Sequence, residues 1–443
     1  MKKEQAQKIK IALLGLGLDN QALLKLFSNK DNIEITICDK RKKENLPIIK
    51  SNKIKLSYRL ENNFNRNLFD FDILFRSPGW PINCPGLQLA LKKGSHLSSA
   101  LDIFFKLCKT KNIIGVTGTK GKGTTATLIY QIIKDHLKTL KAKNKPRVYL
   151  GGNIGIAPLS FLNKIKSQDY VVLELSSFQL EDLKHSAKIA VFTNLFKEHL
   201  APADPNNPNF HKSITTYLQA KLNIAKYKEN KILIANKTLE KQLTSKNLKT
   251  KIVYFTESKL GTKIQGDYNR QNIAAAVEVA KYLKIKPNIY QKTISNFKNL
   301  ENRLEPVLTK NNITFFNNSF STAPESTALD LLSFKNPIVQ IAGGADKGAD
   351  FKSLAKTIKA RVKFLILFPG AGSDKIKIEL KKIKFPAEKI FIASGMKTAV
   401  ETAWQQAKSG DIILLSTACA SFGLFKNYKE RGSLFKQEVK KIK

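Results

Sequence analysis

A glycine-rich loop between an apolar strand and a helical pattern constrains the fold of this chain most strongly. The apolar run 112–116 precedes the loop and a helical pattern over 126–136 follows it. The loop reads Gly118, Thr119, Lys120, Gly121, Lys122, Gly123, Thr124 and Thr125. Successive backbone N–H groups of such a loop turn towards phosphate oxygens, and the helix N-terminus adds a favourable dipole. The sequence therefore predicts a nucleotide-phosphate site, with a glycine turn carrying a solvated lysine as the alternative.

The side chains of this loop indicate how phosphate and metal are held. Lys122 can reach the β- and γ-phosphates of a nucleotide. Gly123 stands where Ser or Thr is usual, so Thr124 or Thr125 has to supply the hydroxyl that binds Mg²⁺.

Short apolar runs alternate with helical patterns along the whole chain, which is typical of parallel α/β layers. The length of 443 residues fits about three domains of roughly 150 residues. Strands are predicted at 10–15, 34–38, 71–75, 112–116, 170–175, 189–193, 231–235, 313–316, 338–342, 364–368, 390–392 and 412–415, and a further helix at 272–283. We predict an α/β protein of three domains: a Rossmann-like N-terminal domain (1–107), a central P-loop ATPase-like domain (108–300) and a Rossmann-like C-terminal domain (301–443).

Composition narrows the functional classes. The 76 Lys and Arg residues against 35 Asp and Glu give a formal net charge of +41, which raises nucleic acid or an anionic membrane as a partner. The lysines are spread over all three blocks, without a basic tail or an aromatic–basic pattern, so we expect small anionic ligands and no nucleic acid. A basic P-loop NTPase that binds nucleic acid stays as the alternative. Four scattered cysteines and the lack of a long apolar run predict a cytoplasmic protein without a membrane span.

Three loops of the first block are expected to meet where parallel sheets bind ligands, at the carboxyl ends of their strands. They carry Gly17 in the turn Gly15-x-Gly17, then Asp39, and then Ser77, Pro78 and Gly79. A nucleotide-diphosphate site fits this pattern. A tight strand–helix turn and an ordinary turn aspartate are equally good interpretations of the first two.

Two residues of the second block are candidate metal ligands. Glu174 ends an apolar strand, where a carboxylate is costly unless it is paired or bound to metal. Mg²⁺ suits it, and an ion pair with Lys or Arg is the alternative. His199 follows another strand end, although a lone histidine is more often structural.

With these residues the chain resembles the Mur ligases, the ATP-dependent amide-forming enzymes of peptidoglycan synthesis, over nearly its whole length. After the phosphate loop, the motifs follow in the family's order: Gly151-Gly152-Asn153-Ile154-Gly155, the run 174–181, Tyr217-x-x-Ala220-Lys221-Leu222, Asn269-x-x-Asn272, Arg303, Gly343-Gly344-x-Asp346-Lys347, the run 415–422, Phe425-Lys426-Asn427-Tyr428 and Arg431-Gly432. The Leu-Ser-Ser-Phe-Gln-Leu run and the stretch 415–432 are similar to the branch that adds D-glutamate.

The resemblance implies a reaction in which ATP activates the carboxylate of UDP-N-acetylmuramoyl-L-alanine as an acyl phosphate and D-glutamate then attacks. A sister Mur or folylpolyglutamate-type ligase with another amino acid is the nearest alternative, and the Ser421/Tyr428 stretch discriminates between them. The resemblance also implies ATP and two Mg²⁺ ions as cofactors, and a monomer in solution.

The resemblance also implies roles for single residues. The catalytic residues are Lys122, Lys221, His199 and Lys347. ATP is bound by the loop residues 118–125 and by Asn269, Arg303 and Asn318. The substrates contact Gly17, Asp39, Ser77, Pro78, Gly79, Asn153, Ser176, Gln179, Lys347, Ser421, Phe422 and Tyr428. The metal ligands are Thr124, Glu174, His199 and Lys221, the last as a carbamylated lysine.

The sequence departs from the family pattern at several of these motifs. Besides Gly123, the departures are Ala201 after the His199 motif, Tyr268 before Asn269, Asn318 at a common Asp position, Phe320 at a position that is Lys in some members, and Thr417 and Gly423 in the last signature. Each departure affects a single expected contact with ATP, metal or glutamate. The motifs around these positions are retained.

Overall fold

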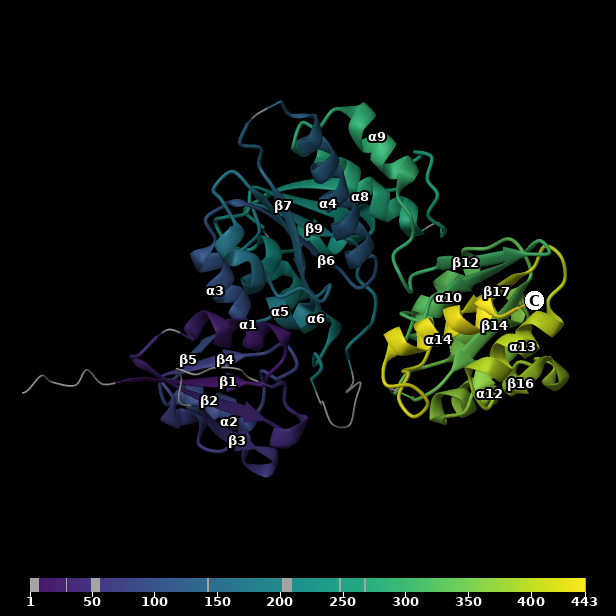
Figure 1. The fold of residues 1–443 in the computed structure, drawn as a ribbon, viewed down its shortest axis with the longest axis horizontal. Coiled ribbons are helices and arrows are strands. Elements are labelled where there is room, and N and C mark those ends of the chain that lie inside the picture. Colours follow the sequence, from purple (N-terminus) through teal and green to yellow (C-terminus); the bar gives the residue numbers. More distant parts are fainter. Residues whose placement is uncertain are drawn as a thin grey trace, which may run out of the picture. The chain divides into compact units, whose positions relative to one another are not determined.

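The computed structural model describes residues 8–28, 30–48, 56–141, 143–200, 209–246, 248–266, 268–346 and 348–442. It is a mixed α/β fold built on three sheets, each flanked by helices (Figure 1). The chain forms two compact units: unit 1 lies within residues 1–257 and 272–293, and unit 2 within 258–271 and 294–443. Of the helices in the described ranges, none is both long and apolar enough to cross a membrane.

The first sheet, in unit 1, is parallel and has the strand order β3-β2-β1-β4-β5. Its strands are β1 (Ile9–Leu14), β2 (Ile33–Asp39), β3 (Leu56–Leu60), β4 (Ile73–Arg76) and β5 (His96–Ser98). Its helices are α1 (Leu18–Phe27), α2 (Pro85–Lys92) and α3 (Ala100–Leu107). The order reverses at β1 and β4, so the loops after these strands open at the point where such sheets bind ligands.

The second sheet is also parallel, with the order β11-β10-β9-β6-β8-β7. Its strands are β6 (Asn112–Thr117), β7 (Val148–Gly152), β8 (Tyr170–Glu174), β9 (Ile189–Phe192), β10 (Ile232–Asn236) and β11 (Lys251–Phe255). The helices that follow along the chain are α4 (Lys122–Thr139), α5 (Ser177–Leu180), α6 (Ile214–Leu222), α7 (Glu240–Thr244), α8 (Tyr268–Tyr282) and α9 (Pro287–Asn296).

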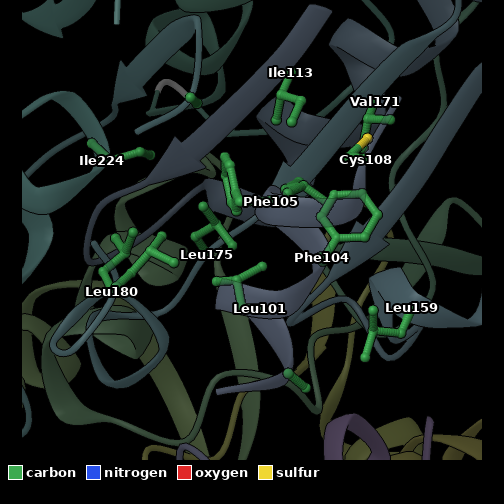
Figure 2. Close-up of a cluster of buried hydrophobic side chains, with 14 of the residues drawn as sticks. Leu101, Phe104, Phe105, Cys108, Ile113, Leu159, Val171, Leu175, Leu180 and Ile224 are labelled. Atoms are coloured by element: carbon green, nitrogen blue, oxygen red, sulfur yellow. The ribbon is translucent and has the colours of Figure 1, made fainter. Parts of the chain in front are cut away.

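One hydrophobic cluster joins the first two sheets. Figure 2 shows Phe104 and Phe105 of α3 beside Ile113 of β6 and Val171 of β8. The same cluster reaches Leu13 in β1. Burying two large aromatic rings in a neighbouring core contributes several kcal/mol at ~2–3 kcal/mol each, which ties α3 firmly to the second sheet. The boundary near residue 107 thus falls inside a shared core, and the three-domain division stays a prediction.

The third sheet, in unit 2, has the order β12-β13-β17-β14-β15-β16. Its strands are β12 (Glu305–Lys310), β13 (Ile313–Asn317), β14 (Ile338–Gly343), β15 (Val362–Phe368), β16 (Ile390–Ile392) and β17 (Ile412–Leu415), and its helices are α10 (Pro324–Leu332), α11 (Lys352–Arg361), α12 (Ala371–Lys382), α13 (Met396–Gln406) and α14 (Tyr428–Lys440). In β14, Ile338 and Ala342 enter one core and Val339 and Ile341 the other, as the two-residue period of a strand requires. The predicted doubly wound sheet is therefore present, with β12 added as an antiparallel edge.

Each predicted strand corresponds to an observed strand, and no end is shifted by more than two residues. The helix predicted over 126–136 is confirmed and extends over the whole of α4. The strands that the sequence analysis missed are β3, β5, β7, β11 and β12, all of which lie at sheet edges.

Candidate functional site

The glycine-rich loop connects β6 to α4, and close packing explains two of its glycines. Gly118 and Gly121 have positive φ angles of 142° and 78°. A Cβ at Gly118 would lie 2.0 Å from Thr193 Oγ1, and one at Gly121 would lie 2.1 Å from Asn272 Oδ1. A side chain at either position would therefore distort the loop. Lys122 is the first residue of α4, so its side chain begins at the positive end of the helix dipole.

Asn194, two residues beyond the end of the neighbouring strand β9, holds the loop. Its Oδ1 accepts from the Lys120 amide at 2.8 Å, and its Nδ2 donates to the Lys120 carbonyl at 3.1 Å. Its own carbonyl accepts from the Thr119 amide at 2.9 Å. Asn194 was not among the residues predicted from the sequence. Its position just beyond a strand end is the same signal that pointed to Glu174 and His199.

Two lysines converge on the carbonyls of the loop. Lys122 Nζ donates to the Thr119 carbonyl at 2.8 Å, and Lys221 Nζ donates to the Gly118 carbonyl at 2.8 Å. Lys221 is 1% exposed and its Nζ lies 4.4 Å from the centre of the Tyr217 ring. Burial, and then the nearby charge of Lys122, hold the pKa of Lys221 well below its ordinary value. This lysine is thus biased towards the neutral amine.

The two candidate hydroxyls of α4 differ in their surroundings. Thr125 is buried and its Oγ1 donates to Asn272 Oδ1 at 3.2 Å. Thr124 is only partly buried. Since the Thr125 hydroxyl already serves an internal hydrogen bond, Thr124 is the better candidate for a metal or phosphate ligand.

Glu174 ends β8 beside the loop, because it pairs in register with Val116 of β6. It is 2% exposed, and its Oε1 accepts from Asn153 Nδ2 at 2.9 Å. Its buried Oε2 has no hydrogen-bond partner among the described residues. A desolvated carboxylate oxygen without a partner is costly, so this atom suits a cation that arrives with the nucleotide.

The donor set around Glu174 fits Mg²⁺. Within the part of the chain that the structure describes, no three His, Cys, Asp or Glu side chains gather into a metal cluster. Mg²⁺ commonly uses one or two carboxylates and takes its other ligands from phosphate and water. The ion-pair alternative for Glu174 is not what the structure shows, since the observed partner is the Asn153 amide.

His199 lies among aromatic rings and has a φ of 59°. Its ring meets the edge of Phe178 at a centroid distance of 5.0 Å. His211 stacks on the same Phe178 ring at a centroid distance of 4.7 Å. Its backbone amide donates to the His199 carbonyl at 2.8 Å. The sequence analysis missed His211, which is buried and bonds Ser177 Oγ through Nε2 at 2.9 Å. Burial, followed by the charges of His199, Lys221 and Arg76, lowers the pKa of His211 to about 4.

Ser176 and Gln179 form the capping box of α5. The Ser176 hydroxyl accepts from the Gln179 amide at 3.2 Å, and Gln179 Oε1 accepts from the Ser176 amide at 3.1 Å. Gln179 Nε2 also donates to Asp19 Oδ2 in α1 at 3.3 Å. These two residues therefore connect the second sheet to the first within unit 1.

The turn that contains Gly15 and Gly17 is stabilised by hydrogen bonds to the Asp39 carboxylate. Asp39 Oδ2 accepts from the Leu16 amide at 2.8 Å, and Arg41 binds both Asp39 oxygens at 2.9 and 2.7 Å. Although burial raises the pKa of Asp39, the hydrogen bonds from Arg41 and Leu16 outweigh it and leave the pKa below its ordinary value. Both Asp39 oxygens thus accept hydrogen bonds that stabilise the turn, and Gly17 is the N-cap of α1.

Arg76, at the end of β4, connects the loop of Ser77, Pro78 and Gly79 to the second sheet. Its Nε donates to Asp182 Oδ2 at 2.7 Å and its Nη2 to the Phe178 carbonyl at 2.6 Å. Asn209 Nδ2 donates to the Pro78 carbonyl at 2.7 Å. Arg76 was missed, although a charged residue at the end of an apolar strand is the signal that identified Glu174.

In unit 2, three residues of the predicted motifs meet. The Arg303 guanidinium lies 3.6 Å from the centre of the Phe320 ring, and Tyr428 meets that ring edge-on at 5.1 Å. Asn318 is buried at the end of β13, where its amide donates to the Leu415 carbonyl at 2.8 Å. The other predicted residues of this unit are Asn269 and Ser421, both buried, and Phe422, which is 55% exposed. Lys347 and Ala201 lie outside the described residues.

Comparison with protein families gives two matches. Residues 116–295 match the Mur ligase middle domain, and residues 302–419 match the Mur ligase glutamate ligase domain. The chain is 34% identical to the UDP-N-acetylmuramoylalanine--D-glutamate ligase of Clostridium tetani over 98% of this chain and 97% of the relative. It is 33% identical to the enzyme of the same name from Acetivibrio thermocellus, covering 99% and 98% of the two chains.

Solved structures agree in fold. The MurF ligase of Thermotoga maritima, determined in complex with ADP, matches with a TM-score of 0.60 and 16% identity over 99% of this chain and 96% of that one. The UDP-N-acetylmuramate-alanine ligase of Thermotoga maritima matches with a TM-score of 0.56 and 16% identity over 98% and 99%. Full-length similarity to the named relatives, joined to the two domain matches, identifies the family. The chain belongs to the Mur ligases.

Proposed function

We propose that this protein is an ATP-dependent ligase that adds D-glutamate to UDP-N-acetylmuramoyl-L-alanine, a cytoplasmic step of peptidoglycan synthesis. The observation that carries the proposal is the pairing of the phosphate loop with Glu174, whose Oε2 is buried without a partner among the described residues. The names of the full-length relatives support D-glutamate as the amino acid. ATP binding is common to the family.

The chemistry must overcome the poor electrophilicity of a carboxylate. The alanine carboxylate attacks the γ-phosphorus of ATP, and ADP leaves. The amine of D-glutamate then adds to the carbonyl of the acyl phosphate. The tetrahedral species expels phosphate, and the amine proton passes to solvent or base. The protein contributes mainly by positioning the reactants and by neutralising charge that develops on phosphate oxygens.

In unit 1 we assign ATP to the loop residues 118–125, with Lys122 as the cation for the γ-phosphate. Lys122 is preorganised by its bond to the Thr119 carbonyl, and phosphate would replace that carbonyl as its partner. Asn153, Ser176 and Gln179 are assigned to the muramoyl-alanine. Gly17, Asp39, Ser77, Pro78 and Gly79 are assigned to the sugar nucleotide, where the 45% exposed side chain of Arg41 is available to meet an anion.

Glu174, Thr124 and His199 are the residues that would hold Mg²⁺. The ion supplies Lewis-acid polarisation and charge neutralisation of the phosphates when bound. Lys221 is assigned as a carbamate, formed when its neutral amine adds to CO₂ and releases a proton. Its buried position and lowered pKa favour the neutral amine that this addition requires.

In unit 2 we assign Asn269, Arg303 and Asn318 to ATP and Lys347, Ser421, Phe422 and Tyr428 to D-glutamate. Two carboxylates on the amino acid call for cationic and hydroxyl partners, which this set contains.

The test is phosphate release measured with ATP, UDP-N-acetylmuramoyl-L-alanine and a panel of amino acids. We expect release only when the sugar nucleotide and D-glutamate are both present. Release with another amino acid but not with D-glutamate would contradict the assignment and favour a sister ligase. A tight, salt-sensitive complex with DNA or RNA, together with no ligation, would favour the nucleic-acid alternative.

We further propose that the protein acts as a monomer. Light scattering after size-exclusion chromatography should give a mass close to 49.7 kDa. A mass of twice this value would contradict the proposal.

A further inference from the structure

The loop after β13 brings together residues that are far apart in the sequence. Its Phe320 ring is 38% exposed. The guanidinium of Arg303 lies over one face of this ring at 3.6 Å, and the ring of Tyr428 meets it at an interplanar angle of 89°. One aromatic side chain therefore contacts both a residue assigned to ATP and a residue assigned to D-glutamate.

Hydrogen bonds from the same loop fix the backbone beside Arg303 and at Tyr428. The Phe320 amide donates to the carbonyl of Asn302, which precedes Arg303, at 3.2 Å. Ser319 Oγ donates to the carbonyl of Tyr428 at 2.8 Å. The ring contacts are thus reinforced by hydrogen bonds to the main chain at Asn302 and at Tyr428.

Arg431 anchors the loop from α14. It is fully buried, its Nη2 donates to the Ser319 carbonyl at 2.9 Å, and its Nε donates to Ser319 Oγ at 3.0 Å. On the other side, Asn317 Nδ2 donates to Asn302 Oδ1 at 3.0 Å. Buried hydrogen bonds of this kind rigidify the segment that carries them.

We propose that Phe320 is a positioning residue that holds Arg303 and Tyr428 in one arrangement and so links recognition of the nucleotide to recognition of the amino acid. The inference rests on the proposed function, in which Arg303 contacts ATP and Tyr428 contacts D-glutamate. A side chain that is ordered before its ligand arrives loses less entropy on binding, so the contacts of Phe320 lower the cost of binding at both residues. A lysine, which stands at this position in some members, would repel Arg303, whereas the ring attracts it.

The test compares Phe320→Met, Phe320→Tyr and a matched control, Phe391→Met. Methionine keeps an apolar side chain but removes the ring, and tyrosine restores the ring. Phe391 lies on β16, the edge strand opposite β12, and is 37% exposed, close to the exposure of Phe320. The KM values for ATP, D-glutamate and the UDP-sugar, the kcat and the unfolding temperature are measured for each.

We expect Phe320→Met to raise the KM for ATP and for D-glutamate by about 3- to 10-fold each, the size of one cation–π and one aromatic contact. The KM for the UDP-sugar and the unfolding temperature should stay unchanged, Phe320→Tyr should behave as the wild type, and so should Phe391→Met.

Three results would overturn the inference: a KM for ATP or for D-glutamate that does not change, a rise that tyrosine fails to reverse, or a rise that accompanies a lower unfolding temperature. A wild-type protein that releases no phosphate with D-glutamate would instead overturn the proposed function itself.

Discussion

Unit 1 contains two glycine-containing turns that each connect a strand to a helix, and the charged side chains around them differ. In the first, the Leu16 amide is met by the Asp39 carboxylate, which Arg41 in turn neutralises. In the second, the Gly118 and Thr119 carbonyls accept hydrogen bonds from the Nζ atoms of Lys221 and Lys122. The first turn therefore contains an internal carboxylate, whereas the second holds the Lys122 side chain at the start of α4.

This difference teaches which turn is built to hold phosphate. A turn whose amide is already bonded to an internal carboxylate gains little from an external anion at that amide. A loop with a cationic side chain at a helix N-terminus binds an anion favourably, because the anion neutralises that positive charge. Substitutions in the second turn should therefore lower kcat, whereas those in the first should leave kcat unchanged and affect stability and the binding of the sugar nucleotide.

The largest effect is expected for Lys122→Ala. Losing the cation proposed for the γ-phosphate should reduce kcat about 10³-fold, in the range seen when a charge-stabilising donor is removed. The measurement is ATP-dependent phosphate release. Lys138→Ala, near the far end of the same helix with a side chain 65% exposed, is the control and should keep wild-type activity. Full activity in Lys122→Ala would refute the role of the loop.

Glu174→Gln comes next. The amide keeps the shape of the side chain but removes the charge that Mg²⁺ prefers, so we expect kcat to fall about 10²-fold and the Mg²⁺ concentration for half-maximal rate to rise. Glu278→Gln, a partly exposed residue paired with Lys281, is the control. A variant with an unchanged Mg²⁺ titration would show that Glu174 does not hold the metal.

Lys221 should make both activity and stability depend on pH. Because its pKa is lowered in the folded state, the unfolded chain binds more protons, and the free energy of unfolding should rise with pH between the lowered value and the ordinary 10.5. Lys221→Met should flatten this part of the curve, measured by urea unfolding in CO₂-depleted buffer. In the wild type, added bicarbonate should raise the rate, and ¹³C-labelled bicarbonate should give a carbamate signal. The same signal in Lys221→Met would place the carbamate elsewhere.

The smallest effect on catalysis is expected for Asp39→Asn, which breaks the first turn. Its lost charge-assisted bonds should lower the free energy of unfolding by about 1 kcal/mol, since Arg41 is half exposed and screened by solvent. The kcat should stay the same. The native pKa of Asp39 is lowered, so its contribution is present above the ordinary 3.8 and is lost as the pH falls through the native value. A kcat reduced as strongly as in Lys122→Ala would erase the distinction between the two turns.

Much of the site was predictable because it follows buried strands. Glu174, His199 and the phosphate loop all lie just beyond apolar runs, and the carboxyl ends of parallel strands meet at one edge of a sheet. Three residues were missed because sequence spacing does not reveal their contacts. Asn194 and Arg76 bond to partners more than 70 residues away, and His211 stacks on the ring of Phe178. For Asp39, only the structure shows that both carboxylate oxygens accept hydrogen bonds within the turn, from Leu16 and Arg41.

By itself the sequence determined the α/β class, the central strands and the family. Strands such as β6 and β14 are buried on both faces, so they appear as continuous apolar runs. Only the tertiary structure decided the edge strands β3, β5, β7, β11 and β12. Each has a neighbouring strand on one side only, so these strands are partly exposed and contain both polar and apolar residues. It also decided that α3 joins the first two sheets in one core and that Phe320 joins Arg303 to Tyr428. These contacts depend on packing between distant segments, which no local pattern encodes.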